Sequence, residues 1–498
     1  MYLLGVDIGS SSEKAVVFDY LGNIVSIAKT DYPIYAMQDD WSEQNVEDYY
    51  TAFLKNLETI GSAVLEKVTA ICICGQTPTD IFVDCKGEPL RRAIMWRDTR
   101  AKAQLERQKQ KYSFEELERL TGCPIPKTEN WTTLRMSWVK ENERKIAQKI
   151  YKVLQPKDYL IYKLSGKFVT DLWSARCFSN VHTGKPNEEL LSFFGYEKSV
   201  VPETFKVADV CGNVVNETVQ GLGLNKEVKI ICGCSDGFAA MLASGLFGEV
   251  GVAFNSTGTS EMAGVAKMNE SQSQGQGVYI FPSSLTDEKA VCFGPTQSGG
   301  ASLIWFAKNV LNVSFDEMIE LAEKSSAGSN GLVFLPYING ERAPIWDGNA
   351  KGCFFGIKNT HTACDFARSV LEGVAFSIRS IIEASGQMEI STLRLLGGGS
   401  KIPLWCQIRA DVLGVAVETV DCEEACAKGA AMIAGVGMGI YSSYRESAKK
   451  SCKVGSRYEP NFKNKEIYDR NYRVYKALYE STKELMKESN SITQETEV

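Results

Sequence analysis

Two hydroxyl-rich turns in this chain have the composition of phosphate-binding loops. The first lies between two apolar runs, Tyr2–Ile8 and Ala15–Phe18, and consists of Gly9, Ser10, Ser11 and Ser12. The second lies within VAFNSTGTSEMAGVA, residues 252–266. Backbone N–H groups and hydroxyls in such turns can donate to phosphate oxygens, although one turn alone is equally typical of a tight hairpin. Two of them, one in each half of the chain, indicate that the protein clamps a nucleotide.

Two aspartates are candidates for chemistry at the bound phosphate. Asp7 lies near the end of the first apolar run, where its carboxylate could hold a metal ion that bridges to the phosphate. Asp236 lies in GCSDGFAAMLASG, after the apolar run Val228–Cys232 and at the head of a helix of small residues. Phosphoryl transfer to a hydroxyl needs a carboxylate beside the attacking oxygen. Asp236 could supply that carboxylate, and an N-cap is the alternative interpretation.

A third glycine-rich segment, Gly397–Lys401, follows a predicted strand and precedes a predicted helix. Its bare backbone could approach an adenine ring or a phosphate. The segment lacks the Gly-Lys-Ser/Thr ending of a Walker loop. A plain strand-to-helix turn would explain it equally well.

Alternating strands and helices in both halves of the chain must position these residues. Both halves open with strands and continue in αβ alternation, which predicts an α/β fold of two related lobes joined near residues 240–250. In the first half the predicted strands are 2–8, 15–18, 24–30 and 69–74, and the helix is 46–60. In the second half the predicted strands lie within 251–266, 276–281, 290–293, 393–396 and 415–419, and the helices are 302–310, 315–325 and 404–413. Two further helices of small residues, 237–245 and 429–437, suit either a hinge or close packing.

The bulk composition excludes several classes of protein. With 498 residues the chain is too long for one core, and its net charge of −6 argues against a general nucleic-acid surface. Its apolar runs are shorter than the roughly 18–20 residues of a membrane span. The odd number of cysteines (15) and the absence of a secretory segment at MYLLGVDIGS predict a cytoplasmic protein. The pairs Cys72/Cys74 and Cys232/Cys234 are expected to be buried on strands.

The ordered set of motifs resembles the FGGY carbohydrate kinases, which belong to the same superfamily as hexokinase, actin and Hsp70. GVDIGSSSEKAVVFD resembles the first phosphate motif of that family, and NSTGTSEM resembles the second. GCSDG resembles the block that carries the catalytic aspartate. Other segments similar to family blocks are Trp41-Ser42-Glu43-Gln44, 75–101 with its W-x-D-x-R ending, 156–175, 336–357, 369–380, and 396–418 followed by 424–431. The similarity runs in order from Tyr2 to Tyr441.

This resemblance implies a fold of two actin-like (ribonuclease H-like) lobes with a cleft between them, and phosphorylation of a sugar that depends on ATP and Mg²⁺. Asp236 would be the base, and Asp7 would help to hold the magnesium. The implied nucleotide contacts are Gly9, Ser10, Ser11, Ser12, Lys14, Thr259, Gly300, Gly398, Gly399 and Ser400. The implied sugar contacts are Gln76, Thr77, Pro78, Trp96, Asp98, Asp171 and Asp236. For Asp98, a buried ion pair with Arg100 or another arginine is an equally good interpretation.

The pattern lies nearest the xylulose kinase branch of the family, so the expected reaction converts D-xylulose to D-xylulose 5-phosphate. The chain keeps Gln76 but has Thr77-Pro78 where xylulose kinases carry Met-His and glycerol kinases carry Arg-Glu. Another ketose, a pentitol, erythritol or an aldonate therefore stays open as the substrate. A non-catalytic, ATP-driven switch on the actin-like fold is the alternative of a different class.

The resemblance also suggests how the chain is divided. The expected parts are an N-terminal lobe over residues 1–245, a C-terminal lobe over 246–488 and a polar tail over 489–498. A sugar and ATP are the expected partners, without nucleic acid or membrane. The predicted helix 465–487 suits either a homodimer contact or a cover for its own lobe.

Overall fold

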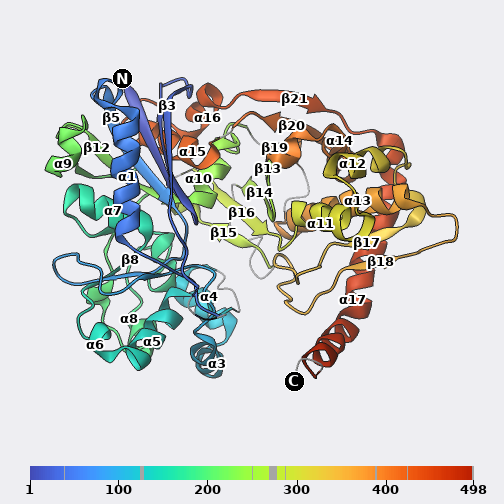
Figure 1. Cartoon of the computed structure of the whole chain (residues 1–498), viewed down its shortest axis with the longest axis horizontal. Helices are drawn as coiled ribbons and strands as arrows, with labels where there is room; N and C mark the ends of the chain where they lie inside the picture. Colours follow the sequence, from blue (N-terminus) through green and yellow to red (C-terminus); the bar gives the residue numbers. More distant parts are fainter. Residues whose placement is uncertain are drawn as a thin grey trace. The chain divides into compact units, whose positions relative to one another are not determined.

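The computed structural model describes residues 1–36, 38, 40–123, 128–249, 251–267, 277–286, 288–386, 390–422 and 424–495 (Figure 1). The chain forms two compact units, each assembled from separate segments. Unit 1 contains Met1–Gly248, Phe281–Ala290 and Glu424–Cys452, and unit 2 contains Glu249–Ile280, Val291–Glu423 and Lys453–Val498. The predicted division at residues 245/246 therefore needs one correction, because two segments of the predicted second lobe pack with the first unit.

Unit 1 is built on a six-stranded mixed sheet with the strand order β11-β12-β5-β1-β2-β3. Its strands are β1 (Tyr2–Ile8), β2 (Ser12–Phe18), β3 (Ile24–Asp31), β5 (Val68–Gly75), β11 (Val210–Asn213) and β12 (Lys229–Ser235). β1, β5 and β12 run parallel to one another, whereas β1, β2 and β3 form an antiparallel meander. The strands predicted at 2–8, 15–18, 24–30 and 69–74 are confirmed, as are buried cysteines at positions 72, 74, 232 and 234.

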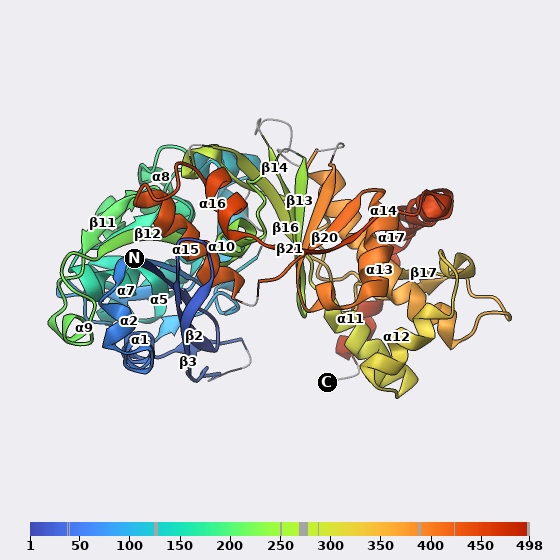
Figure 2. The same ribbon diagram turned by 90° about the horizontal axis from the view of Figure 1, so that it is seen from above.

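Helices cover both faces of this sheet, which is why its central strands are apolar on both sides. On one face, Leu4, Val6 and Ile8 of β1 join a core with apolar residues of α1 (Glu47–Ile60) and α7 (Pro156–Ser165). On the other face, Gly5 lies against α15 (Ala425–Gly437). The red helix α15 comes from the C-terminal part of the chain, yet it belongs to the unit of the blue strands (Figure 2).

The two helices of small residues pack closely against each other within unit 1. A Cβ added to Gly429 of α15 would lie 1.8 Å from the carbonyl oxygen of Ala239 in α10 (Asp236–Ala243). A Cβ added to Gly5 would lie 1.9 Å from the carbonyl oxygen of Ala427. The glycines therefore let α15 touch both α10 and β1 through backbone atoms, as the close-packing interpretation requires.

The remainder of unit 1 carries short two-stranded sheets and a second helical core. The short sheets are β4 (Glu43–Gln44) with β7 (Ala93–Ile94), β6 (Ile81–Val83) with β8 (Lys152–Leu154), and β9 (Val169–Asp171) with β10 (Glu203–Phe205). The principal helices are α3 (Lys102–Lys111), α4 (Phe114–Thr121), α5 (Thr132–Asn142), α6 (Arg144–Ala147) and α8 (Glu188–Phe193).

Unit 2 repeats the plan of unit 1 on a seven-stranded sheet, with the order β15-β16-β14-β13-β19-β20-β21. Its strands are β13 (Val252–Thr257), β14 (Glu261–Lys267), β15 (Tyr279–Phe281), β16 (Ala290–Pro295), β19 (Thr392–Gly397), β20 (Ala416–Val420) and β21 (Val454–Tyr458). The hairpin β13–β14 corresponds to β1–β2, and β13 pairs in parallel with β19 as β1 does with β5. Its principal helices are α11 (Gly300–Trp305), α12 (Phe315–Glu323), α13 (Ala363–Ala384), α14 (Pro403–Leu413) and α17 (Lys465–Glu495). The predicted helices at 302–310, 315–325 and 404–413 are present, the first as α11 followed by a π-helical turn over Phe306–Leu311.

The end of the chain differs from the prediction. The polar tail expected over 489–498 is helical through Glu495, because α17 continues without a break, and residues 496–498 lie outside the described residues. Within the described part of the chain, every helix is too short or too polar to span a lipid bilayer.

Replacing Gly429 with alanine tests the close packing of α15. The added Cβ would meet the Ala239 carbonyl oxygen, and overpacking of this kind costs about 1–3 kcal/mol. We expect Gly429→Ala to lower the free energy of unfolding by this amount in urea denaturation followed by circular dichroism. Gly221→Ala is the control, because Gly221 ends the short helix α9 (Glu217–Gly221) and no other part of the chain lies within 4 Å of its added Cβ. Equal stability of Gly429→Ala and wild type would contradict the packing.

Candidate active site

Three neighbouring parallel strands of unit 1 end at the same edge of the sheet. In the strand register, Asp7 of β1 lies beside Cys74 of β5, and Cys74 lies beside Cys234 of β12. Asp236 begins α10 directly after β12 ends at Ser235. Ligands of open parallel sheets bind beyond this carboxyl edge. The fold therefore brings together the two aspartates that the sequence analysis selected.

Burial makes both carboxylates costly to ionise. Burial raises the pKa of Asp7 to about 7, with a further increase from the charge of Asp236 and opposition from Lys14. Burial raises the pKa of Asp236 to about 6, although the backbone N–H of Gly237 donates to its Oδ1 atom at 2.6 Å. Both groups consequently titrate near neutrality, and a cation between them would favour their ionised forms.

This arrangement suits a magnesium ion. Among the residues that the structure describes, the Asp7 carboxylate accepts a hydrogen bond only from the Cys74 thiol, at 3.8 Å, which leaves most of its lone pairs unused. In the same part of the chain, no group of three or more Asp, Glu, His or Cys side chains could hold a metal. Mg²⁺ is usually bound by one or two carboxylates together with water and substrate phosphates. Asp7 and Asp236 match that requirement in number and in chemistry.

The turn Gly9–Ser12 has its carbonyl groups tied back to the protein. The four acceptors are Gly9 O (Tyr32 hydroxyl, 2.6 Å), Ser10 O (Gln44 Nε2, 2.8 Å), Ser11 O (Tyr32 N, 3.0 Å) and Ser12 O (Gly9 N, 3.0 Å). Carbonyl oxygens would repel a phosphate, so their engagement elsewhere leaves N–H groups and hydroxyls as the groups available to an anion. The hairpin prediction is therefore confirmed, and binding of a phosphate by the same turn stays a prediction.

Lys14 lies on β2 opposite Asp7, and its ammonium group forms an ion pair of 2.7 Å with Glu424. Glu424 directly precedes α15, in the block EACAKGAA that resembles the adenosine-binding end of the family pattern. The structure instead places it in unit 1, beside the first turn. An ammonium group has three donors, so Lys14 can hold Glu424 and still reach a phosphate. Sequence reasoning missed this pairing because no local pattern relates positions 14 and 424.

Two of the predicted sugar contacts lie close to the first turn. Gln76 follows β5 and is 2% exposed; its amide nitrogen donates to Gln44, while its Oε1 atom has no partner among the described residues. Trp96 is 37% exposed, and its indole N–H donates to Ser10 Oγ at 3.0 Å. Between them in sequence, Thr77 precedes Pro78 through a cis peptide bond, and the Thr77 hydroxyl lies 3.3 Å from Gln155 Oε1. A buried acceptor atom without a partner and an exposed ring thus lie near the first turn.

Asp98 and Asp171 are engaged in buried ion pairs. Arg100 binds both oxygens of Asp98 (2.8 and 2.7 Å), and the backbone N–H of Ser42 donates to one of them at 2.6 Å. Asp171 lies 3.0 Å from the Lys157 ammonium and also accepts two backbone N–H groups. The ion-pair interpretation of Asp98 is therefore confirmed. Both aspartates hold the backbone around the site, and a direct sugar contact for either of them stays a prediction.

The predicted nucleotide contacts of unit 2 also gather at one edge of its sheet. β13 and β19 end side by side, with Thr257 opposite Gly397. The backbone N–H of Gly399 donates to the Thr257 hydroxyl at 2.7 Å, and the N–H of Gly300 donates to Gly258 O at 2.9 Å. Thr259 is exposed in the turn, Ser400 closes its own turn by donating to Gly397 O, and no atom lies within 4 Å of a Cβ added to Gly398. These segments offer open backbone to a flat ligand.

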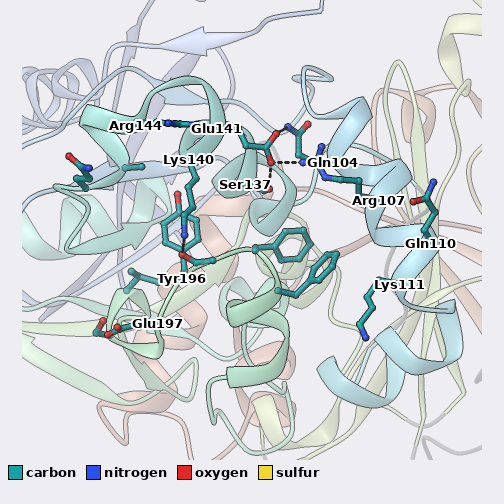
Figure 3. Close-up of a pocket in the computed structure, with 17 residues that line it drawn as sticks. Gln104, Arg107, Gln110, Lys111, Ser137, Lys140, Glu141, Arg144, Tyr196 and Glu197 are labelled. Atoms are coloured by element: carbon teal, nitrogen blue, oxygen red, sulfur yellow. Dashed lines mark hydrogen bonds and ion pairs between the residues drawn. The ribbon is translucent and has the colours of Figure 1, made fainter.

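A hollow of about 1160 Å³ lies elsewhere in unit 1, between α3, α5, α6 and residues 193–200 (Figure 3). None of the residues that line it is a predicted site residue. Its central carboxylate, Glu141, already accepts hydrogen bonds from Arg107, Gln104 and Ser137. The chemistry described above therefore lies outside this hollow.

Comparison with known proteins identifies the family. The N-terminal domain of the FGGY family of carbohydrate kinases matches residues 2–243, and its C-terminal domain matches residues 253–438. The chain belongs to the FGGY family of carbohydrate kinases. It is 31% identical to a xylulose kinase of Staphylococcus epidermidis (strain ATCC 12228 / FDA PCI 1200), and the alignment covers 99% of each chain.

A second relative and a solved structure are also similar to most of this FGGY kinase. It is 26% identical to a gluconokinase of Bacillus subtilis (strain 168), over 89% of this chain and 88% of the relative. A crystal structure of ligand-bound xylulose kinase from Lactobacillus acidophilus superposes with a TM-score of 0.89 at 24% identity, over 97% and 98% of the two chains. The predicted α/β fold of two units is confirmed. The protein is an ATP-using carbohydrate kinase, so the alternative of a non-catalytic switch is set aside.

The raised pKa of Asp7 predicts how stability depends on pH. In the unfolded chain an aspartate titrates near pH 4, whereas in the folded protein burial moves the pKa of Asp7 to about 7. Above pH 7 the group is ionised in both states, and only the folded state bears the cost of burying the charge. Below about pH 4 it is neutral in both. Asp7→Asn should therefore be more stable than wild type at pH 8, with an advantage that vanishes as the pH falls from 7 to 4.

Thermal unfolding in the presence of EDTA measures this difference. A difference of about three pKa units corresponds to about 4 kcal/mol, and 1 kcal/mol shifts the Tm by about 2–4 °C in a unit of this size. We therefore expect the Tm of Asp7→Asn at pH 8 to exceed that of wild type by at least about 4 °C. Asp316→Asn, at an exposed position of α12, is the control and should leave the Tm unchanged at both pH values. A Tm of Asp7→Asn at or below that of wild type at pH 8 would show that the carboxylate is not destabilising.

Proposed function

We propose that this FGGY kinase phosphorylates D-xylulose to D-xylulose 5-phosphate. The observation that carries the proposal is the 31% identity to a xylulose kinase over 99% of both chains. Retention of Gln76, with an unpartnered buried acceptor atom, supports a polyhydroxylated substrate, because sugar hydroxyls are donors that such an atom can accept.

In this proposal Asp236 orients the acceptor hydroxyl and takes its proton as the new O–P bond forms. Its pKa of about 6 makes it ionised, yet still basic, at neutral pH. The turn Gly9–Ser12 and Lys14 bind the β- and γ-phosphates of ATP through N–H, hydroxyl and ammonium donors. In unit 2 the remainder of the nucleotide is bound by Thr259, Gly300, Gly398, Gly399 and Ser400.

Asp7, with Asp236 beside it, would hold Mg²⁺ together with the phosphates of ATP. When bound, this ion neutralises charge on the phosphate oxygens during the transfer. The raised pKa of Asp7 supports this role, since an electrostatically strained carboxylate gains most from a cation.

An aldonate such as gluconate is the second candidate substrate. A gluconokinase is among the relatives that match most of the chain. The Thr77-Pro78 pair also removes the imidazole that xylulose kinases carry at this position, and with it one hydrogen-bonding group. Loss of a polar contact can change selectivity by several orders of magnitude.

A panel of acceptors in a coupled ADP-release assay separates these substrates. We expect kcat/KM to be highest for D-xylulose, at least about tenfold above D-gluconate, xylitol, erythritol and other ketopentoses, since one lost polar contact discriminates by this much or more. The highest kcat/KM on D-gluconate would replace the first candidate with the second. If the enzyme phosphorylates none of these compounds, both candidate substrates are overturned.

Substitution of Asp236 tests its role as base. We expect Asp236→Ala to lower kcat by about 10²–10⁴-fold, while the Kd for ATP, measured by calorimetry without sugar, stays within a few-fold of wild type. Asp316→Ala is the matched control and should leave both quantities unchanged. An Asp236→Ala enzyme that turns over at close to the wild-type rate would remove Asp236 from the mechanism.

A further inference from the structure

A two-stranded ribbon holds Ser10, the second residue of the phosphate turn, from one side. The ribbon consists of β4 and β7, with Gln44 opposite Ala93. The side-chain amide of Gln44 donates to the carbonyl oxygen of Ser10 at 2.8 Å. Trp96, which follows β7, donates its indole N–H to the hydroxyl oxygen of Ser10 at 3.0 Å. Both strands of the ribbon therefore deliver a hydrogen bond to the same residue.

Gln44 is itself fixed by its surroundings. It is 1% exposed, and its Oε1 atom accepts from the Tyr49 hydroxyl at 2.8 Å and from Gln76 Nε2 at 2.7 Å. Because two donors face the amide oxygen, the amide nitrogen must point the other way, toward Ser10. The result is a continuous chain of side-chain amides from Gln76 through Gln44 to the phosphate turn.

These two hydrogen bonds determine what Ser10 presents to a ligand. Trp96 occupies the hydroxyl oxygen as a donor, so the hydroxyl proton of Ser10 is directed elsewhere and is available to an anion. The hydrogen bond from Gln44 keeps the Ser10 carbonyl oxygen engaged within the protein, so that this oxygen does not face a bound anion. Ser10 is thereby oriented as a donor to phosphate from both its side chain and its backbone.

We propose that Gln44 and Trp96 are positioning residues that orient Ser10 toward the phosphates of ATP, and that they couple nucleotide affinity to occupancy of the sugar site. The coupling rests on the proposed function, because Gln76 and Trp96 are proposed sugar contacts. A sugar that binds Gln76 or Trp96 restricts the same groups that hold Ser10. Binding of either ligand then reduces the ordering cost of the other, and the effect on affinity is reciprocal.

The role of the W-S-E-Q segment in this unit supports the inference. Glu43 forms ion pairs with Arg91 and, at 2.8 Å, with Arg100, and Trp41 packs on the Arg100 guanidinium at 3.9 Å. These contacts anchor the ribbon but reach no predicted ligand. Among the hydrogen bonds of the described residues, Gln44 is the one member of this segment that binds the phosphate turn, so the segment serves to present this amide.

Calorimetric binding of AMP-PNP with Mg²⁺ to the full-length enzyme tests the proposal. For wild type, we expect a saturating amount of the best sugar from the acceptor panel to lower the Kd of AMP-PNP at least fivefold. Trp96→Phe keeps an aromatic ring but lacks the N–H, and Gln44→Met keeps the size of the side chain but lacks the amide. We expect both variants to raise the sugar-free Kd at least threefold and to reduce the effect of sugar to less than twofold.

Steady-state kinetics adds the KM for ATP, a quantity that the loss of a sugar contact alone would not change. We expect the KM for ATP to rise in Gln44→Met, which changes a residue that has no predicted contact with either substrate. Trp346→Phe, the same substitution as Trp96→Phe, likewise removes an indole N–H hydrogen bond, here to Gly277 O. It is the control and should leave the Kd of AMP-PNP unchanged. Since Trp96 is partly exposed, Trp96→Phe should retain the wild-type Tm, which separates this test from a folding defect.

The outcomes distinguish this inference from the proposed function. If both variants are folded and bind AMP-PNP as wild type does, with and without sugar, the inference is overturned while an active wild-type kinase retains its proposed function. If wild type phosphorylates none of the acceptors, the proposed function fails. The orientation of Ser10 is then tested by the sugar-free Kd of Trp96→Phe alone, and an unchanged Kd overturns it. A wild-type Kd that does not respond to sugar overturns the coupling.

Discussion

The convergence of two acidic side chains at one edge of a parallel sheet is the constraint on which the rest of unit 1 depends. Asp7 and Asp236 reach this edge because β1, β5 and β12 are adjacent, parallel and in register at their carboxyl ends. Burial raises the pKa of both groups toward neutrality, and the charge of Asp236 raises that of Asp7 further. Two buried carboxylates lower the stability of the folded state, and active sites commonly retain such destabilising groups because activity requires them. The surrounding structure is arranged so that positive charge can be brought to these carboxylates.

Close backbone packing also determines which charged groups lie near these carboxylates. α15 can lie against β1 only because Gly5 and Gly429 leave room for carbonyl oxygens of neighbouring elements. This packing brings Glu424, which directly precedes α15, to the ammonium of Lys14. A segment from late in the chain thus completes a site whose other members come from the first 240 residues. Gly429, in a helix that suited either a hinge or close packing, thus helps to determine the position of a charged group.

The predicted sugar-binding residues divide into two physical classes. Asp98 has both carboxylate oxygens bound by Arg100, and Asp171 forms an ion pair with Lys157 and accepts two backbone N–H groups, so both stabilise the loops that surround the site. Gln76 and Trp96 retain an unused acceptor atom and an exposed ring. Under the proposed function, discrimination among sugars therefore depends most on residues of the second class and on their neighbours Thr77 and Pro78.

The sequence by itself determined the elements and the chemistry of their ends. Apolar runs bounded by Gly/Ser/Thr turns predicted both hairpins, and an acidic residue beside each strand end identified Asp7 and Asp236, because strand periodicity and turn composition are local properties. Only the tertiary structure decided which distant residues meet: Lys14 with Glu424, Gln44 with Ser10, and Asp171 with Lys157. Such pairs join residues that no local period relates, and each depends on the angle at which whole elements pack. The chain encodes its strands in neighbouring residues, but it encodes the surroundings of Asp7 and Asp236 in contacts that form only when those strands and helices are assembled.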